Sequence, residues 1–146
     1  LSSGSQVIAR DESVNAKYTD VSGQQINTTP TLLIYPTKEF DTHGIYNTTN
    51  GQIIPKTSGK YRIKINIGAS DSLDYTLIIK FLVNGVEKSY TQFNSDFNSI
   101  IYETFDDMLK LNAGDIVEIY MESSNTPINL STNANVNNLV IERIGD

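Results

Sequence analysis

The chain carries few side chains that could perform catalysis. It has one histidine, His43, and no cysteine. A serine triad would have to combine His43 with a distant serine, and no Gly-x-Ser-x-Gly nucleophile motif is present. The lack of cysteine excludes thiol catalysis, disulfides and thiolate zinc sites. We therefore expect a protein that is not an enzyme, with His43 in a loop or an interface.

Clustered carboxylates are the second group that could do chemistry. Asp71 and Asp74 lie three residues apart in a segment that is expected to be a loop. Hard cations such as Ca²⁺ bind clustered oxygens, so these two residues are weak candidates for calcium ligands. A solvated acidic loop explains the same spacing, and we expect no cofactor.

Polar uncharged side chains and aromatic rings are the remaining candidates for ligand binding. They are concentrated in segments 89–99 and 125–138, which are expected to be loops at the rim of the fold. Amides and hydroxyls can hydrogen-bond to sugars, and aromatic rings offer stacking surfaces. Simple solvated connections are the alternative. The candidate residues are Tyr90, Phe93, Phe97, Asn125, Asn129 and Asn133.

Size and charge limit the possible partners. The 146 residues, 16.2 kDa, suffice for one domain, which we place at 6–146 after a linker or expression remnant at 1–5. Lys and Arg number 11 against 17 Asp and Glu, a net charge of −6. This balance disfavours nucleic acid as a partner. No run approaches the roughly 18 apolar residues of a membrane span, so no membrane insertion is expected.

Alternating apolar and polar residues predict strands that would position these groups. In segment 61–67, Tyr61, Ile63, Ile65 and Ile67 share one face. Turn signals such as Asn84-Gly85 recur about every ten residues, which is typical of an antiparallel sandwich or barrel. One helical turn is conceivable at 105–111. The other predicted strands are 76–83, 115–121 and 139–144, with further candidates at 31–35, 52–54 and 100–105 and weaker ones at 7–10 and 86–93.

A series of motifs begins at Phe40 with Phe-Asp-Thr-His-Gly-Ile-Tyr-Asn at 40–47 and continues through Asn-Gly and Pro to Gly-Lys-Tyr at 59–61. Phe-Leu-Val-Asn-Gly at 81–85 and Leu-Lys-Leu-Asn-Ala-Gly-Asp-Ile-Val at 109–117 follow in order. With these motifs the sequence resembles, over roughly 7–144, the C1q-like head domain of the tumour-necrosis-factor-like jelly rolls. Asn137-Asn138-Leu139-Val140 replaces the usual aromatic residue and glycine near the end, and the N-terminal part looks more like bacterial and phage versions. The signature residues are Phe40, Gly44, Tyr46, Gly51, Pro55, Gly59, Tyr61, Asn84, Gly85, Gly114 and Asp115.

The resemblance implies an all-β, antiparallel jelly-roll sandwich of about ten strands that assembles as a homotrimer. Segments 76–83 and 115–121 are apolar on more than one face. The excess could line a subunit interface, or both segments could simply be central strands.

The resulting functional hypothesis is a non-catalytic, trimeric head domain that binds a protein or carbohydrate receptor. It would be exposed on a cell, spore or virion surface, in a collagen-like bacterial protein or a phage fibre. Two alternatives remain open: a monomeric carbohydrate-binding module of sandwich type, and a purely structural trimerisation or decoration domain.

Overall fold

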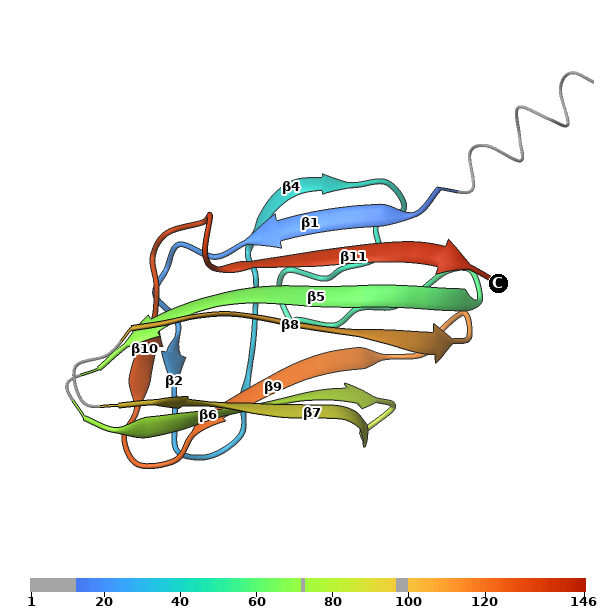
Figure 1. The fold of residues 1–146 in the computed structure, drawn as a ribbon. Helices are drawn as coiled ribbons and strands as arrows, with labels where there is room; N and C mark the ends of the chain where they lie inside the picture. The colour runs from blue at the N-terminus through green and yellow to red at the C-terminus, as the bar shows by residue number, and fades with distance from the viewer. Residues whose placement is uncertain (1–12, 72, 97–99) are drawn as a thin grey trace, which may run out of the picture.

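The computed structural model describes residues 13–71, 73–96 and 100–146, and in this part of the chain all regular structure is β. Eleven strands form two antiparallel sheets that face each other as a sandwich (Figure 1). No helix that could cross a bilayer occurs in the part that the structure describes. The predicted all-β, antiparallel jelly-roll class is confirmed.

The larger sheet, sheet A, is built around the long strand β5. In this sheet β5 pairs with β8 along its whole length on one side and with β11 and β10 on the other. The order continues from β11 through β1 to β4, while β2 pairs with β10. Sheet A therefore ends in β8 at one edge. Its strands are β1 (Asn15–Thr19), β2 (Gln25–Ile26), β4 (Thr37–Asp41), β5 (Gly59–Ser70), β8 (Ile100–Leu111), β10 (Ile128–Leu130) and β11 (Asn138–Gly145).

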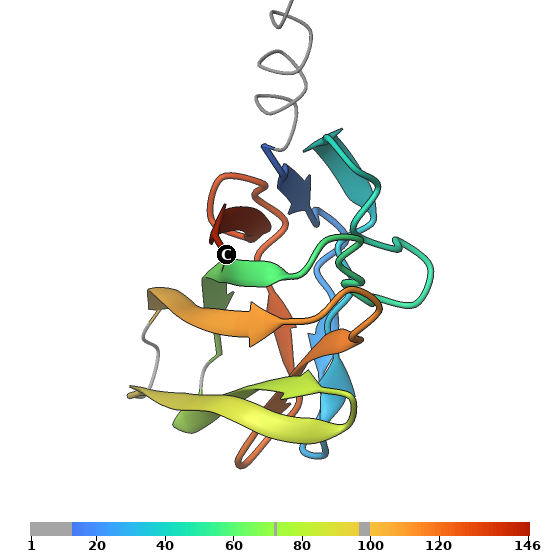
Figure 2. The same cartoon turned by 90° about the vertical axis from the view of Figure 1, so that its right-hand side faces the viewer.

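The smaller sheet, sheet B, lies beneath it in the order β3-β9-β6-β7. Its strands are β3 (Thr31–Leu32), β6 (Tyr75–Val83), β7 (Val86–Ser95) and β9 (Val117–Ser123). Strand β7 forms one edge of this sheet, and it contacts β8 of sheet A. Turned by 90°, the molecule shows these two edge strands one above the other (Figure 2).

The core follows from the alternation in the sequence. Residues Tyr61, Ile63, Ile65 and Ile67 of β5 are at most 1% exposed, while the polar residues between them point outward. Strand β6 alternates in the same way, with Leu77, Ile79 and Phe81 inside. Each of the isoleucine, leucine and phenylalanine side chains among them contributes about 1.5–3 kcal/mol when fully buried. Together they hold the two sheets face to face.

Most predicted strands are present, with three corrections. Segment 105–111 belongs to β8, so the helical turn is wrong; this strand pairs with β5 along its length. Segment 52–54 contributes only single bridges at Ile53, to Tyr46 and Val117. Segment 31–35 is a strand at Thr31–Leu32 alone. The predicted strand at 7–10 and the linker at 1–5 lie outside the described residues.

Candidate functional site

The loop at 42–47, directly after β4, carries the first motif of the resemblance, and we call it the signature loop. The Asp41 carboxylate organises this loop. Its Oδ1 accepts hydrogen bonds from the backbone N–H groups of His43 (3.2 Å) and Ile45 (3.0 Å). Its Oδ2 accepts from the Tyr18 hydroxyl (2.7 Å) and the Tyr46 N–H (3.2 Å). Partial burial works to raise the pKa of Asp41, but these four donors outweigh it and hold the pKa below its ordinary value. Asp41 is thus a charged anchor for the loop.

Three tyrosines pack behind this loop. The rings of Tyr18 and Tyr46 lie 4.7 Å apart, and the Tyr46 hydroxyl accepts a hydrogen bond from the Tyr35 N–H (2.9 Å). Burial raises the pKa of Tyr46 to about 12, and burial also raises the pKa of Tyr35 and Tyr18. All three hydroxyls therefore remain neutral at physiological pH, as expected for tyrosines that fill a core.

Two signature glycines occupy positions that no larger residue fits. Gly51 has a φ of +69°, and a Cβ there would lie 2.6 Å from the Leu33 carbonyl oxygen. A Cβ on Gly59 would lie 2.5 Å from both the Arg143 Nε and the Gly145 carbonyl oxygen. These glycines let neighbouring segments approach closely.

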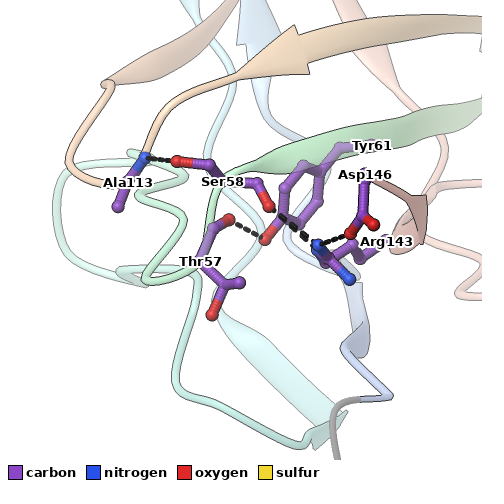
Figure 3. Close-up of polar contacts among 6 residues, drawn as sticks. All are labelled: Thr57, Ser58, Tyr61, Ala113, Arg143 and Asp146. Carbon is purple, nitrogen blue, oxygen red and sulfur yellow. Dashed lines mark hydrogen bonds and ion pairs between the residues drawn. The ribbon is translucent and has the colours of Figure 1, made fainter.

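Figure 3 shows how the end of β11 clamps the turn before β5. The Arg143 guanidinium donates from Nε (3.1 Å) and Nη2 (2.9 Å) to the Ser58 carbonyl, and Nη2 also contacts Asp146 at 2.8 Å. The Tyr61 hydroxyl donates to the Thr57 carbonyl (2.6 Å), and the Ala113 N–H donates to the Ser58 hydroxyl (3.1 Å). The clamp joins three segments that are distant in the sequence.

The remaining signature residues tie two turns together. Asn84 and Gly85 both have positive φ, as a tight hairpin turn requires. The Asn84 amide donates to Asp115 Oδ1 (3.0 Å), while its Oδ1 accepts from the Ile116 N–H (2.9 Å). The Gly114 N–H donates to the carbonyl of the buried Pro55 (2.8 Å). The structure thus brings Asn84 and Asp115 into contact, a pairing that sequence spacing did not indicate.

Phe40 differs from the other signature aromatics because its side chain is 45% exposed on β4. Gly44, also exposed, has a φ of +62° in the loop that Asp41 anchors.

The open edge formed by β7 and β8 differs from the signature loop and the Arg143 clamp, where hydrogen bonds join neighbouring segments. Strand β8 pairs only with β5, and β7 only with β6, among the strands that the structure describes. Three large apolar side chains of β8 point out of sheet A into solvent: Ile100 (58% exposed), Tyr102 (64%) and Met108 (48%). We call these three residues the edge patch. A depression of about 440 Å³ adjoins it, and Ile100, Tyr102, Ser70 and Asn129 are among the residues that line it.

The candidate ligand-binding residues are spread over the molecule. Tyr90 and Phe93 lie on strand β7 and not in a loop, because segment 86–95 pairs with β6. Tyr90 is exposed, whereas Phe93 packs against the core. Asn129 lies on β10, and Phe97 lies outside the described residues.

The two other candidate asparagines lie in turns and contact the backbone. The Asn125 amide donates to the Asp74 carbonyl (3.0 Å), and Asn133 Oδ1 accepts from the Asn135 N–H (2.9 Å). Their loops are thereby partly ordered by their own side chains.

Asp71 and Asp74 lie between β5 and β6, where Asp71 Oδ1 accepts from the Leu73 N–H (3.0 Å). In the described ranges, no three His, Cys, Asp or Glu side chains are grouped to hold a metal ion. His43 contacts the Thr42 hydroxyl through Nδ1 (2.7 Å).

Sequence reasoning did not single out the edge patch. The available signal was the pattern at 100–111, where Ile101, Leu109 and Leu111 fall on one face and Ile100, Tyr102 and Met108 on the other. An edge strand that is apolar on both faces indicates a contact beyond its own sheet.

This sandwich is a C1q/TNF-type jelly roll, as comparison with solved structures shows. It superimposes on the "Globular Domain of Zebrafish Complement 1qA protein" with a TM-score of 0.67 at 14% identity, covering 90% of this chain and 95% of that one. Murine APRIL gives 0.65 at 11% identity, covering 91% and 100%. Eiger TNF from S. frugiperda gives 0.63 at 10%, covering 92% and 94%.

No family model and no curated protein matches the sequence. At identities of 10–14%, the chain shares its fold with the three solved domains.

Proposed function

We propose that the chain is the non-catalytic, homotrimeric receptor- or glycan-binding head of a surface protein or phage fibre. The observation that carries this proposal is the edge patch on β8, an edge strand of 12 residues that pairs with β5 on one side and with no described strand on the other. Unpaired strands that expose apolar side chains tend to associate, and natural proteins usually cover or charge them. A neighbouring copy that packs on the open side of β8 would bury Ile100, Tyr102 and Met108.

The position of the edge patch favours a head-to-tail ring over a two-fold dimer. The edge patch lies at one margin of the outer face of sheet A, whereas β5, further into the same face, carries the charged residues Lys60, Arg62 and Lys64. An edge of one copy that packs on a different surface of the next gives a head-to-tail contact, which forms a ring when the rotation between copies closes. We propose closure at three, as in the homotrimer that the sequence resemblance implies.

Trimer formation would also strengthen binding to a receptor. Three weak sites on one rigid head can raise avidity by roughly 10²–10⁴ when all engage together. The trimer would carry three times the −6 of each chain, which disfavours polyanionic receptors. We expect an extracellular location on a cell, spore or virion surface.

The assembly is tested by light scattering on the purified protein. Three copies of the 16.2 kDa chain give about 49 kDa, and Tyr102→Glu should reduce the mass to that of one chain. The matched control is Val21→Glu, which makes the same apolar-to-acid change at a residue 52% exposed outside β7 and β8, and it should leave the trimer intact. A wild-type mass of one chain would refute the assembly.

A further inference from the structure

The outer face of sheet B carries an aromatic row that the sandwich itself does not need. Register pairs Lys80 of β6 with Tyr90 of β7 on one side and with Tyr120 of β9 on the other. Neighbouring strands lie about 4.8 Å apart, so the two tyrosines are separated by about 10 Å across the sheet. We call these three residues the tyrosine row.

Local contacts hold the row in place. The Lys80 ammonium lies 6.0 Å from the centroid of the Tyr90 ring and 3.5 Å from Glu87 Oε1. The Tyr90 hydroxyl donates a hydrogen bond to Gln92 Oε1 (2.8 Å). Tyr90 keeps 49% of its surface exposed. Its ring is thus oriented by neighbours and still available to a ligand.

A shallow hollow continues the row towards the hairpin turn. It has a volume of about 270 Å³ and is lined by Pro30, Lys80, Leu82, Gly85, Glu87 and Tyr120. Proline, leucine and the tyrosine ring form apolar walls, and the lysine and glutamate supply polar groups at the same place. This mixture of apolar floor and polar groups is typical of a small-molecule site.

The charges around the row select the kind of ligand. Glu118 and Glu122 of β9 alternate with Tyr120 and are partly exposed, and Glu87 lies beside Lys80. Three carboxylates against one ammonium repel acidic ligands and can accept hydrogen bonds from hydroxyl groups. An uncharged ligand rich in hydroxyls complements this surface.

We propose that the tyrosine row binds a neutral oligosaccharide. A pyranose ring has an apolar C–H face that stacks on a tyrosine ring, while its hydroxyls reach carboxylates, amides and the ammonium. The strands that carry the two tyrosines lie two interstrand spacings apart, about 10 Å, which matches the length of a disaccharide unit in an extended glycan. The inference rests on the proposed recognition role and gives it a ligand class and a location.

The site is compatible with the proposed trimer, because the edge patch points out of sheet A and the tyrosine row points out of sheet B. It also explains why segments 76–83 and 115–121 are apolar beyond the core. Ile78, Leu82 and Tyr120 are half-buried on the outer face of sheet B, where they form the floor around Lys80.

The test is calorimetric titration of the full chain with neutral hexasaccharides. The probes are β-1,4-linked glucose, mannose, xylose and N-acetylglucosamine, with hexagalacturonate as the acidic comparator. At least one neutral probe should bind, and Tyr90→Ala and Tyr120→Ala should each weaken it about tenfold, roughly 1.4 kcal/mol. Tyr120→Phe should retain most of the affinity because it keeps the ring. Phe40→Ala, an exposed aromatic on sheet A, is the matched control and should not change binding.

Several outcomes overturn the inference: no neutral probe binds, only the acidic comparator binds, or binding is insensitive to both tyrosines. Light scattering on the same samples separates this inference from the proposed assembly. A trimer that binds no neutral glycan contradicts the tyrosine row alone. Loss of the trimer in Tyr120→Ala would show that the row is a subunit interface, which also refutes it.

Discussion

The two sides of the sandwich differ in how their polar groups and apolar surfaces are satisfied. On the side of the signature loop, one carboxylate receives four hydrogen bonds and the Ser58 carbonyl receives two from Arg143. On the side of β7 and β8, the edge patch remains uncovered. Substitutions on the first side should therefore change folding stability, and those on the second should change association.

The largest effect is expected from Gly51→Ala. The new Cβ would lie 2.6 Å from the Leu33 carbonyl oxygen and would require alanine at a φ of +69°. We expect the free energy of unfolding to fall by about 3 kcal/mol, measured by denaturant unfolding. Gly114→Ala is the matched control, because its φ is +88° but no atom lies within 4 Å of its Cβ position. Its loss should be about 1 kcal/mol, from the backbone conformation alone. Equal losses at both sites would show that the close approach is unimportant.

A smaller effect is expected from Asp41→Asn, which places an amide N–H₂ against donors that now meet a carboxylate. We expect a loss of about 2 kcal/mol at neutral pH. Because the pKa of Asp41 is lowered in the folded protein, its contribution is fully present above its ordinary pKa of 3.8 and is lost as pH falls through the lower folded value. The difference between wild type and variant should therefore shrink in acid, as unfolding curves from pH 7 downward can show. A difference that does not depend on pH would contradict this role.

The smallest effect on this side should come from Arg143→Ala. It removes both hydrogen bonds to the Ser58 carbonyl, and we expect thermal or denaturant unfolding to show a loss of about 1 kcal/mol. Asp146→Ala serves as control, since it breaks the Arg143–Asp146 ion pair but leaves those bonds in place. The Asp146 carboxylate is fully exposed, and an ion pair screened by solvent in this way contributes little, so the control should stay close to wild type. The opposite ranking would show that the ion pair holds the clamp.

The sequence predicted the strands that have a clear inside and outside. Tyr61 to Ile67 alternates with period two, and the structure buries the predicted face. Strand β8 was harder to predict, because an edge strand with apolar residues on both faces lacks that alternation and its end was interpreted as a helical turn. Strands β1 and β4 were missed because they are short and carry charged residues such as Lys17 and Glu39, which form an ion pair across the two strands.

The contacts between residues of the candidate site could not be predicted from the sequence. The signature glycines and tyrosines could be located from the family resemblance, but their partners could not. Asp115 meets Asn84 across 31 residues, and Tyr90 forms a row with Tyr120 only because both pair with Lys80. Register between strands determines these contacts, and register depends on the whole sheet.

The central claim is that a neighbouring copy covers the open side of β8, and amide hydrogen exchange tests it most directly. In the wild-type protein, peptides from 100–111 should exchange slowly, because packing of a neighbour shields the edge from solvent. In Tyr102→Glu the same peptides should exchange faster, while peptides from β11 in the middle of sheet A remain protected. Fast exchange of 100–111 in the wild-type protein, unchanged by Tyr102→Glu, would contradict the account.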